Sequence, residues 1–192
     1  ETNEPYDTFY DAAATYAVVL GEAGLAEYRR RAVAAWEKLP PRSHRRGAQL
    51  DYDSGYETLK RMLDVFAERD GDVESRIALR TKDLSSSWKY LELAEFCLAQ
   101  GREDEALKRA EEGLWIFEDD RPDERLVGFA VKLLVKRKRK GDAETLLWRV
   151  FEKSPGLELY RKLRLFGGVT SRQRAIAVLE VLLAKGQSSQ WH

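Results

Sequence analysis

The sequence is poor in the residues that build disulfides, metal sites and membrane spans. Its 192 residues include one cysteine, Cys97, and two histidines, His44 and His192. A single cysteine excludes an internal disulfide and is typical of a reducing compartment, so we expect a cytoplasmic protein. The longest apolar stretches, 127–135 and 176–184, are short, and each carries a charged residue. Neither can cross a bilayer, which takes about 20 apolar residues, so we expect no membrane partner.

The chain also lacks an excess of charge, of proline and of strand-forming residues. Lysine and arginine together number 33, aspartate and glutamate also number 33, and there are five prolines. The balance argues against a protein dedicated to nucleic acid or to anionic membranes, although it leaves room for local basic patches. Charged residues make up 34% of the chain, which suits many helices that each keep one face in solvent. We therefore expect an all-α fold.

The stretch LAQGREDEALKRAEEGL, at 98–114, predicts two helices joined by a glycine corner. Apolar residues cover most of a helix over 85–100, whereas over 103–117 they recur at the spacing of a one-faced amphipathic helix. Gly101 ends the first helix, because glycine adopts the left-handed conformation without steric cost. A helical hairpin therefore accounts for every residue type in the stretch without any chemistry.

The same pattern recurs along the chain. One-faced helical patterns follow Gly24 and Gly141 and precede Gly71, and an alanine-rich helix is expected over roughly 6–22. The corner glycines 71, 101 and 141 are 30 and 40 residues apart, close to the period of helix-pair repeats. Degenerate repeats of a helical hairpin are the simplest explanation of this spacing.

Several helix starts are also readable. Ser54 with Glu57, and Thr170 with Gln173, have the spacing of capping boxes. Pro122, followed by two acidic residues, is typical of a first helical turn. These signals complete a prediction of about ten helices.

The predicted architecture is a tetratricopeptide-like, right-handed superhelix of about ten antiparallel helices. The whole chain, 1–192, is expected to be a single α-helical repeat domain with a flexible polar loop at about 40–53. Because the sequence starts at Glu1 rather than at methionine, we expect it to be a fragment of a longer protein.

The stretch at 85–114 resembles a tetratricopeptide repeat. The family's large, leucine, small, corner-glycine and alanine positions are occupied here by Tyr90, Leu93, Ala94, Gly101 and Ala106. Cys97 and Gly113 depart from the pattern, because that family usually has tyrosine and alanine there.

A second resemblance covers roughly residues 5–165. The blocks YDTFYDAAATYAVVLGEAGLAEYRRRA, DLSSSWKYLELAEFCLAQGREDEALKRAEEGL and WRVFEKSPGLELYRKL, in this order, are similar to the C-terminal helical region of bacterial SWIM-type zinc-finger proteins. The resemblance implies a zinc-binding segment upstream, proposed to contact DNA or protein. Its C-x-C…C-x-H ligand pattern is absent from this chain, so we expect zinc only in an upstream segment and no cofactor here.

No set of residues in the chain predicts catalysis. A catalytic cysteine needs a positioned base, usually histidine, but Cys97 lies in a predicted helix and is expected to be a buried core residue. His44 and His192 have no neighbouring metal ligands in the sequence. The carboxylates of 117–124 fall at a helix junction, and FGGVTS, at 166–171, lacks the lysine and spacing of a phosphate-binding loop. We therefore do not expect an enzyme.

Two basic runs support an alternative function. RSHRRG, at 42–47, contributes Arg45 and Arg46, and five successive basic residues occupy 136–140. The second run exceeds what a helix C-terminus needs to complement its dipole. Both runs could be solvated faces, or they could contact phosphates in a nucleic-acid-binding accessory domain. The residues of the second run assigned to this basic patch are Arg137, Lys138, Arg139 and Lys140.

The leading interpretation is a non-enzymatic scaffold that binds another protein or a peptide. Stacked helix pairs expose the first helix of each pair on a curved surface that suits such partners. On this surface we expect a mixed-charge groove formed by Lys89, Glu92, Glu95, Lys132 and Lys136. Among the five tryptophans, most are expected to seal hairpin junctions. Trp148 falls off the apolar stripe of its helix and is expected to be exposed, as an interface anchor.

Overall fold

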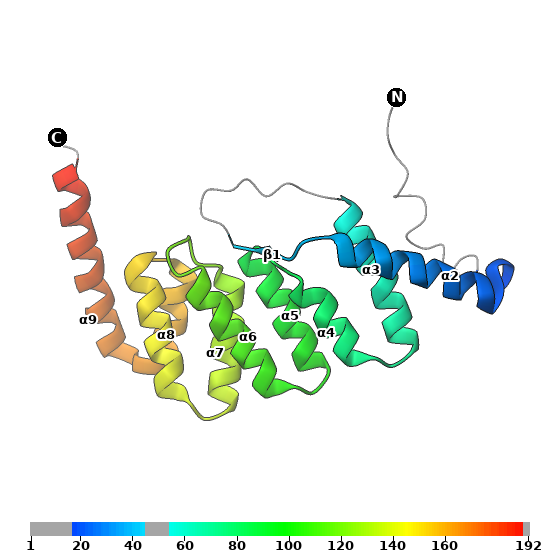
Figure 1. Ribbon diagram of the computed structural model, residues 1–192. Coiled ribbons are helices and arrows are strands. Elements are labelled where there is room, and N and C mark those ends of the chain that lie inside the picture. The colour runs from blue at the N-terminus through cyan, green and yellow to red at the C-terminus, as the bar shows by residue number, and fades with distance from the viewer. Residues whose placement is uncertain (1–16, 45–53, 190–192) are drawn as a thin grey trace. The chain divides into compact units, whose positions relative to one another are not determined.

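The computed structural model describes residues 17–44 and 54–189, most of which lie in α-helices (Figure 1). The all-α prediction is confirmed. In chain order the elements are α2 (Ala17–Lys38), β1 (Arg42–Ser43), α3 (Ser54–Arg69), α4 (Val73–Thr81), β2 (Asp83–Leu84), α5 (Ser87–Ala99), α6 (Glu103–Ile116), α7 (Glu124–Lys136), α8 (Lys140–Lys153) and α9 (Leu157–Ser189).

The helices group into two compact units, with the boundary between Arg102 and Glu103. In unit 1, α2 packs on α3, α3 on α4, and α4 on α5. In unit 2, α6 packs on α7, α7 on α8, and α8 on α9. Each unit is thus a row of helices in which neighbours in the sequence are neighbours in space.

The core of unit 1 is built around two aromatic side chains. The rings of Trp36, from α2, and Tyr56, from α3, have their centroids 4.7 Å apart. Leu63 and Leu79 are buried in the same cluster, so the cluster joins α2, α3 and α4. The apolar spacing expected over 59–66 is confirmed, because Met62, Leu63 and Phe66 are buried.

A short strand pair also belongs to unit 1. Arg42 and Ser43 pair in parallel with Asp83 and Leu84, and the Arg42 amide donates to the Lys82 carbonyl at 2.8 Å. The start of the polar loop predicted at 40–53 is therefore tied to the connection between α4 and α5. The rest of that loop, 45–53, lies outside the described residues.

The core of unit 2 is largely aliphatic. Val127 and Ala130 of α7 and Leu147 of α8 are fully buried. Leu163, in the first part of α9, is fully buried as well. The one-faced patterns that follow Gly101 and Gly141 are confirmed, because the apolar residues that they place on one face are buried: Ala106, Leu107 and Ala110 in α6, and Leu147 and Val150 in α8.

Two helices of unit 1 end at the glycines that the sequence singled out. Gly71 and Gly101 have φ angles of +67° and +76°. At each corner the amide after the glycine donates to the carbonyl five residues back, at 2.8 and 2.9 Å. This pattern satisfies carbonyls that the end of a helix leaves unpaired. Both corners are thus confirmed as helix ends that need a left-handed residue.

The third predicted corner, Gly141, is wrong. Gly141 lies inside α8, and the left-handed residue between α7 and α8 is Lys138, with a φ of +62°. The Arg139 amide donates to the Leu134 carbonyl at 2.9 Å, which repeats the geometry of the glycine corners. A lysine therefore has the left-handed conformation that glycine has at the corners of unit 1, which sequence patterns do not show.

The predicted break at Gly24 is also displaced. Gly24 lies within α2, and the non-helical residue is Gly21, with φ +59° and ψ −178°. At Gly24 a Cβ atom would approach the Leu20 Cβ to 3.0 Å, so glycine serves close packing there. The start of the helix expected over 6–22 lies outside the described residues.

Two predicted helix starts shift as well. α7 begins at Glu124, where the Asp123 carboxylate caps the helix by accepting from the Arg125 amide at 2.9 Å. α9 bends at Gly168, whose φ is +56°. The Thr170 hydroxyl donates to the Gly167 carbonyl at 2.7 Å. FGGVTS is therefore a corner between two parts of α9.

Candidate functional site

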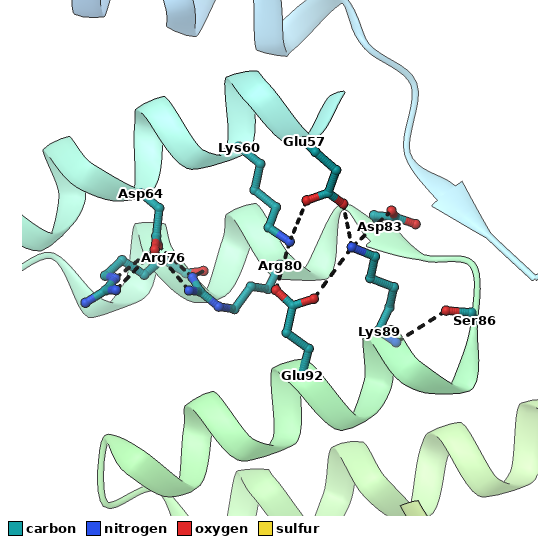
Figure 2. Close-up of polar contacts among 9 residues, drawn as sticks. All are labelled: Glu57, Lys60, Asp64, Arg76, Arg80, Asp83, Ser86, Lys89 and Glu92. Atoms are coloured by element: carbon teal, nitrogen blue, oxygen red, sulfur yellow. Dashed lines mark hydrogen bonds and ion pairs between the residues drawn. The ribbon is translucent and has the colours of Figure 1, made fainter. Parts of the chain in front are cut away.

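The densest group of charged side chains in unit 1 lies between α3 and α5. We call it the α3–α5 network, and it consists of Glu57, Lys60, Asp83, Lys89 and Glu92 (Figure 2). The Lys60 ammonium lies 2.8 Å from Glu92 and 3.4 Å from Glu57. The Lys89 ammonium lies 2.5 Å from Glu57, 3.5 Å from Glu92 and 4.0 Å from Asp83. Each lysine therefore bridges the two helices.

The local structure holds each member of the network in place. The Asp83 carboxylate is 5% exposed and accepts from the Ser85 amide and hydroxyl, at 3.2 and 2.6 Å. Ser86 caps α5, since its hydroxyl accepts from the Lys89 amide at 3.4 Å. The capping and the strand pair together direct the Lys89 side chain towards α3.

The charged forms of the network are stabilised by their neighbours. Burial alone would raise the pKa of Glu57, but the hydrogen bond from Lys89 and the positive charges of Lys60 and Lys89 outweigh it and lower the pKa. Burial alone would lower the pKa of Lys89, but the hydrogen bond to Glu57 and the nearby carboxylates raise it. Both groups are therefore ionised at neutral pH and are poor proton donors or acceptors there.

A second cluster continues along the same face of α3. Asp64 accepts from Arg76 at 3.0 Å and from Arg80 at 2.6 Å, both from α4. The Arg80 guanidinium lies 3.9 Å from the ring centroid of Phe96, on α5. Burial would raise the pKa of Asp64, but the hydrogen bonds from the two arginines outweigh it and lower the pKa. This Asp64 cluster thus links three helices through charge.

The five residues of the predicted groove have different surroundings. Lys89 and Glu92 belong to the α3–α5 network, and Lys136 pairs with Glu103. Glu95 and Lys132 are exposed, and neither forms an ion pair within the described chain. Lys89, Glu92 and Glu95 belong to unit 1, whereas Lys132 and Lys136 belong to unit 2. The groove stays a prediction, and two of its members have a structural role.

Glu57 and Lys60 belong to this site although the sequence did not single them out for it. The capping box predicted for Ser54 and Glu57 stays a prediction, and the Glu57 carboxylate contacts Lys60 and Lys89. Lys60 is only 8% exposed. Its place between Leu59 and Met62, on the apolar side of α3, is a signal that the sequence does contain.

The predicted basic patch is largely compensated by acidic residues. Arg137 pairs with Asp104 at 2.5 Å and with Glu103 at 3.2 Å, at the start of α6. Arg139 pairs with Asp142 at 2.6 Å. Among the described members of the patch, Lys138 and Lys140 are exposed and form no ion pair. Arg45 and Arg46 lie outside the described residues, so nucleic-acid binding stays a prediction.

Of the two tryptophans that the structure describes in unit 2, Trp115 is exposed and Trp148 is buried. The prediction that Trp148 is exposed is wrong, because Trp148 is only 4% exposed. Arg174, from α9, lies 4.1 Å above its ring, and the indole donates to Glu144 at 3.3 Å. Trp148 falls off the apolar stripe facing α7 because it faces α9, the second neighbour of α8.

Trp115 itself is 69% exposed at the end of α6. It follows Lys108 by seven residues and Glu111 by four, so it stands on the charged face of this helix. That spacing is the sequence signal that could have identified it. Trp36 is buried, Trp88 is 45% exposed, and Trp191 lies outside the described residues, so the expectation that most tryptophans seal junctions is only partly met.

The residues considered for catalysis or metal binding are Cys97, His44 and His192. Cys97 is fully buried in α5, as predicted. His44 directly follows β1, and His192 lies outside the described residues. Over 17–44 and 54–189, no three histidine, cysteine or carboxylate side chains gather in a way that could hold a metal ion. No helix in these ranges combines the length and apolar character of a membrane span.

Comparisons with protein-family models, with curated proteins and with solved structures found no match to this chain.

Proposed function

We propose that this chain is a helical scaffold that binds another protein, with Trp115 as an anchor of the contact. The observation that carries the proposal is the 69% exposure of the Trp115 indole on the charged face of α6. Tryptophan is among the residues most enriched at binding hot spots, because its large apolar surface gains from leaving water. The surrounding Lys108 and Glu111 are suited to the polar rim of such a contact.

The repeated corners support a repeat architecture for the scaffold. Gly71, Gly101 and Lys138 share one left-handed helix-end geometry, and each lies between two consecutive helices. We propose that these pairs form a tetratricopeptide-like superhelix, related to the C-terminal region of SWIM-type zinc-finger proteins.

Several features of unit 1 favour binding over catalysis. The pKa of Glu57 is lowered and that of Lys89 is raised, so each group holds its charge near neutral pH. Cys97 is fully buried, which keeps its thiol from solvent and from substrates. The α3–α5 network therefore supplies a fixed pattern of charge rather than a reactive group.

The proposal is tested by affinity capture with three versions of the chain. The wild-type chain is compared with Trp115→Ala and with Trp88→Ala, a matched control at a half-exposed tryptophan of α5. We expect a partner that the wild type and Trp88→Ala retain and Trp115→Ala loses. Once that partner is identified, calorimetric titration should show binding to Trp115→Ala about 30-fold weaker, which corresponds to about 2 kcal/mol.

Two outcomes would contradict the proposal. One is that no protein is retained beyond the level on resin without the chain. The other is that Trp115→Ala binds the identified partner with wild-type affinity. Circular dichroism of both variants establishes that each chain is folded.

A further inference from the structure

The second part of α9, after Gly168, has one face packed within unit 2. Ser171 and Ala175 are each 2% exposed, and the Ser171 hydroxyl donates to the Leu163 carbonyl at 3.2 Å. Arg174 covers the Trp148 ring of α8. These contacts fix how this part of the helix is rotated about its axis.

Beside the packed face runs an exposed apolar stripe. Val169 is 75% exposed, Ile176 45% and Leu183 66%, and these three residues are spaced seven apart. A spacing of seven places residues on one line along a helix, as in helices that pair with a second helix. Leu179, 42% exposed, lies next to this line. We call these four residues the α9 stripe.

A hollow adjoins the α9 stripe and extends its apolar surface. Its volume is about 350 Å³, and Ile176 and Leu179 of the stripe line one side. Phe151, Leu157 and Tyr160 line the other. A helix laid along the α9 stripe would cover this hollow as well, so one partner helix could bury both.

The charges beside the stripe complement each other under a two-fold rotation. Arg172 and Glu180 lie four residues before and four residues after Ile176, close to the line of the stripe. In an antiparallel pair of α9 helices centred at Ile176, Arg172 of each chain is level with Glu180 of the other. Val169 is then level with Leu183. A parallel pair would place like charges together, which is unfavourable.

From this pattern we infer that the α9 stripe binds a second copy of the chain, with the two α9 helices antiparallel about Ile176. Within the residues that the structure describes, neither Arg172 nor Glu180 forms an ion pair, so both are available for the contact. The contact is isologous and closes on itself, so it yields a dimer and not a filament. One helix pair is smaller than a standard interface, so we expect a dissociation constant above about 1 µM.

The test is sedimentation equilibrium of the full chain at protein concentrations up to about 1 mM, where a dimer with a micromolar dissociation constant is well populated. The wild type should dimerise, and Ile176→Glu, at a 45% exposed position, should be monomeric. Arg172→Glu and Glu180→Arg should each weaken the dimer about tenfold or more, since each turns two attractions into repulsions. The double variant Arg172→Glu with Glu180→Arg should restore wild-type dimerisation.

Lys38→Glu makes the same charge change as Arg172→Glu on the exposed surface of α2 and should leave the dimer unchanged. Circular dichroism should show that every variant keeps its helical content. A wild-type chain that stays monomeric would overturn the inference. A dimer insensitive to Ile176→Glu, or a double variant no better than the single ones, would overturn it equally.

Discussion

The two units join their helices by different means. In unit 1, Lys60 and Lys89 link α3 to α5 through carboxylates, and Arg76 and Arg80 link α4 to Asp64. In unit 2, buried aliphatic side chains of α7 and α8 fill the space between helices, and ion pairs stand at the turns. Both units therefore have an apolar core, and in unit 1 charge networks between the helices are added to it.

The difference matters because the two kinds of contact respond to different conditions. Apolar burial contributes about 25 cal/mol per Å² and is insensitive to pH. Charge networks depend on the ionisation of their members, and removal of one member leaves the others buried without a partner. Substitutions in the apolar core and in the charge networks should therefore respond differently to pH.

The largest effect is expected in the apolar core of unit 2. Leu147 is fully buried, so Leu147→Ala should lower the free energy of unfolding by about 3 kcal/mol through lost burial and a cavity. Leu165→Ala, at a position that is 85% exposed, is the matched control and should change it by less than about 0.5 kcal/mol. Urea denaturation followed by circular dichroism measures both. Equal effects at the two positions would remove the distinction between core and surface.

A smaller loss is expected when the α3–α5 network loses a cation. Lys60→Ala should lower the free energy of unfolding by about 2 kcal/mol, because Glu57 and Glu92 would lose one of the two ammonium groups that they share, the other being that of Lys89. Lys132→Ala, at an exposed lysine without an ion pair in the described chain, should be nearly neutral. Amide hydrogen exchange in α3 should be faster in Lys60→Ala than in the wild type, and unchanged in Lys132→Ala. Unchanged exchange in α3 would mean that the network does not hold the helix.

The pH dependence of stability should be carried largely by unit 1. The pKa values of Glu57 and Asp64 are lowered in the folded chain, so the unfolded chain binds more protons as the pH falls. Their contribution to the free energy of unfolding is present above the ordinary pKa range of carboxyl groups. It is lost as the solution is acidified from about pH 5 to pH 3.

Replacement of one network carboxylate tests this dependence, and replacement of an exposed carboxylate is the control. Glu57→Gln should flatten the curve of unfolding free energy against pH, whereas Glu37→Gln, at an exposed site of α2, should leave its slope unchanged. Urea titrations at several pH values provide the curves. A wild-type chain with constant stability down to about pH 3 would contradict the assignment.

The smallest effect compares the corners of the two units. Lys138 has the left-handed conformation that glycine provides in unit 1, at a cost of about 1 kcal/mol for a side chain with a Cβ atom. Lys138→Gly should therefore raise the free energy of unfolding by about 1 kcal/mol or slightly less. Lys132→Gly, at an exposed position inside α7, should instead lower it by a similar amount. A loss of stability in Lys138→Gly would show that the lysine side chain itself holds the turn.

Much of the fold follows from local patterns. The corners at Gly71 and Gly101 were predictable because each glycine follows a helical pattern and, having no Cβ atom, can adopt the positive φ found there without steric cost. The buried faces of α6 and α7 were predictable because apolar residues recur with the helical period. The burial of Cys97 followed from its apolar neighbours.

The candidate sites depended on contacts between residues distant in sequence. Glu57 and Lys89 are separated by 32 residues and meet only because α3 and α5 both lie against α4. Arg137 meets the acidic residues at the start of α6 only because α6 packs on α7. Trp148 turned from an expected anchor into a core residue because α8 has a second neighbour, α9.

Local sequence patterns were enough to predict that the chain is helical, where its glycine corners lie in unit 1, and which faces are apolar. These properties depend on backbone conformation and on side chains a few residues apart. The tertiary structure decided which charges are paired and which tryptophan faces solvent. Both depend on which helices become neighbours, because Coulomb attraction and burial act between side chains that only packing brings together.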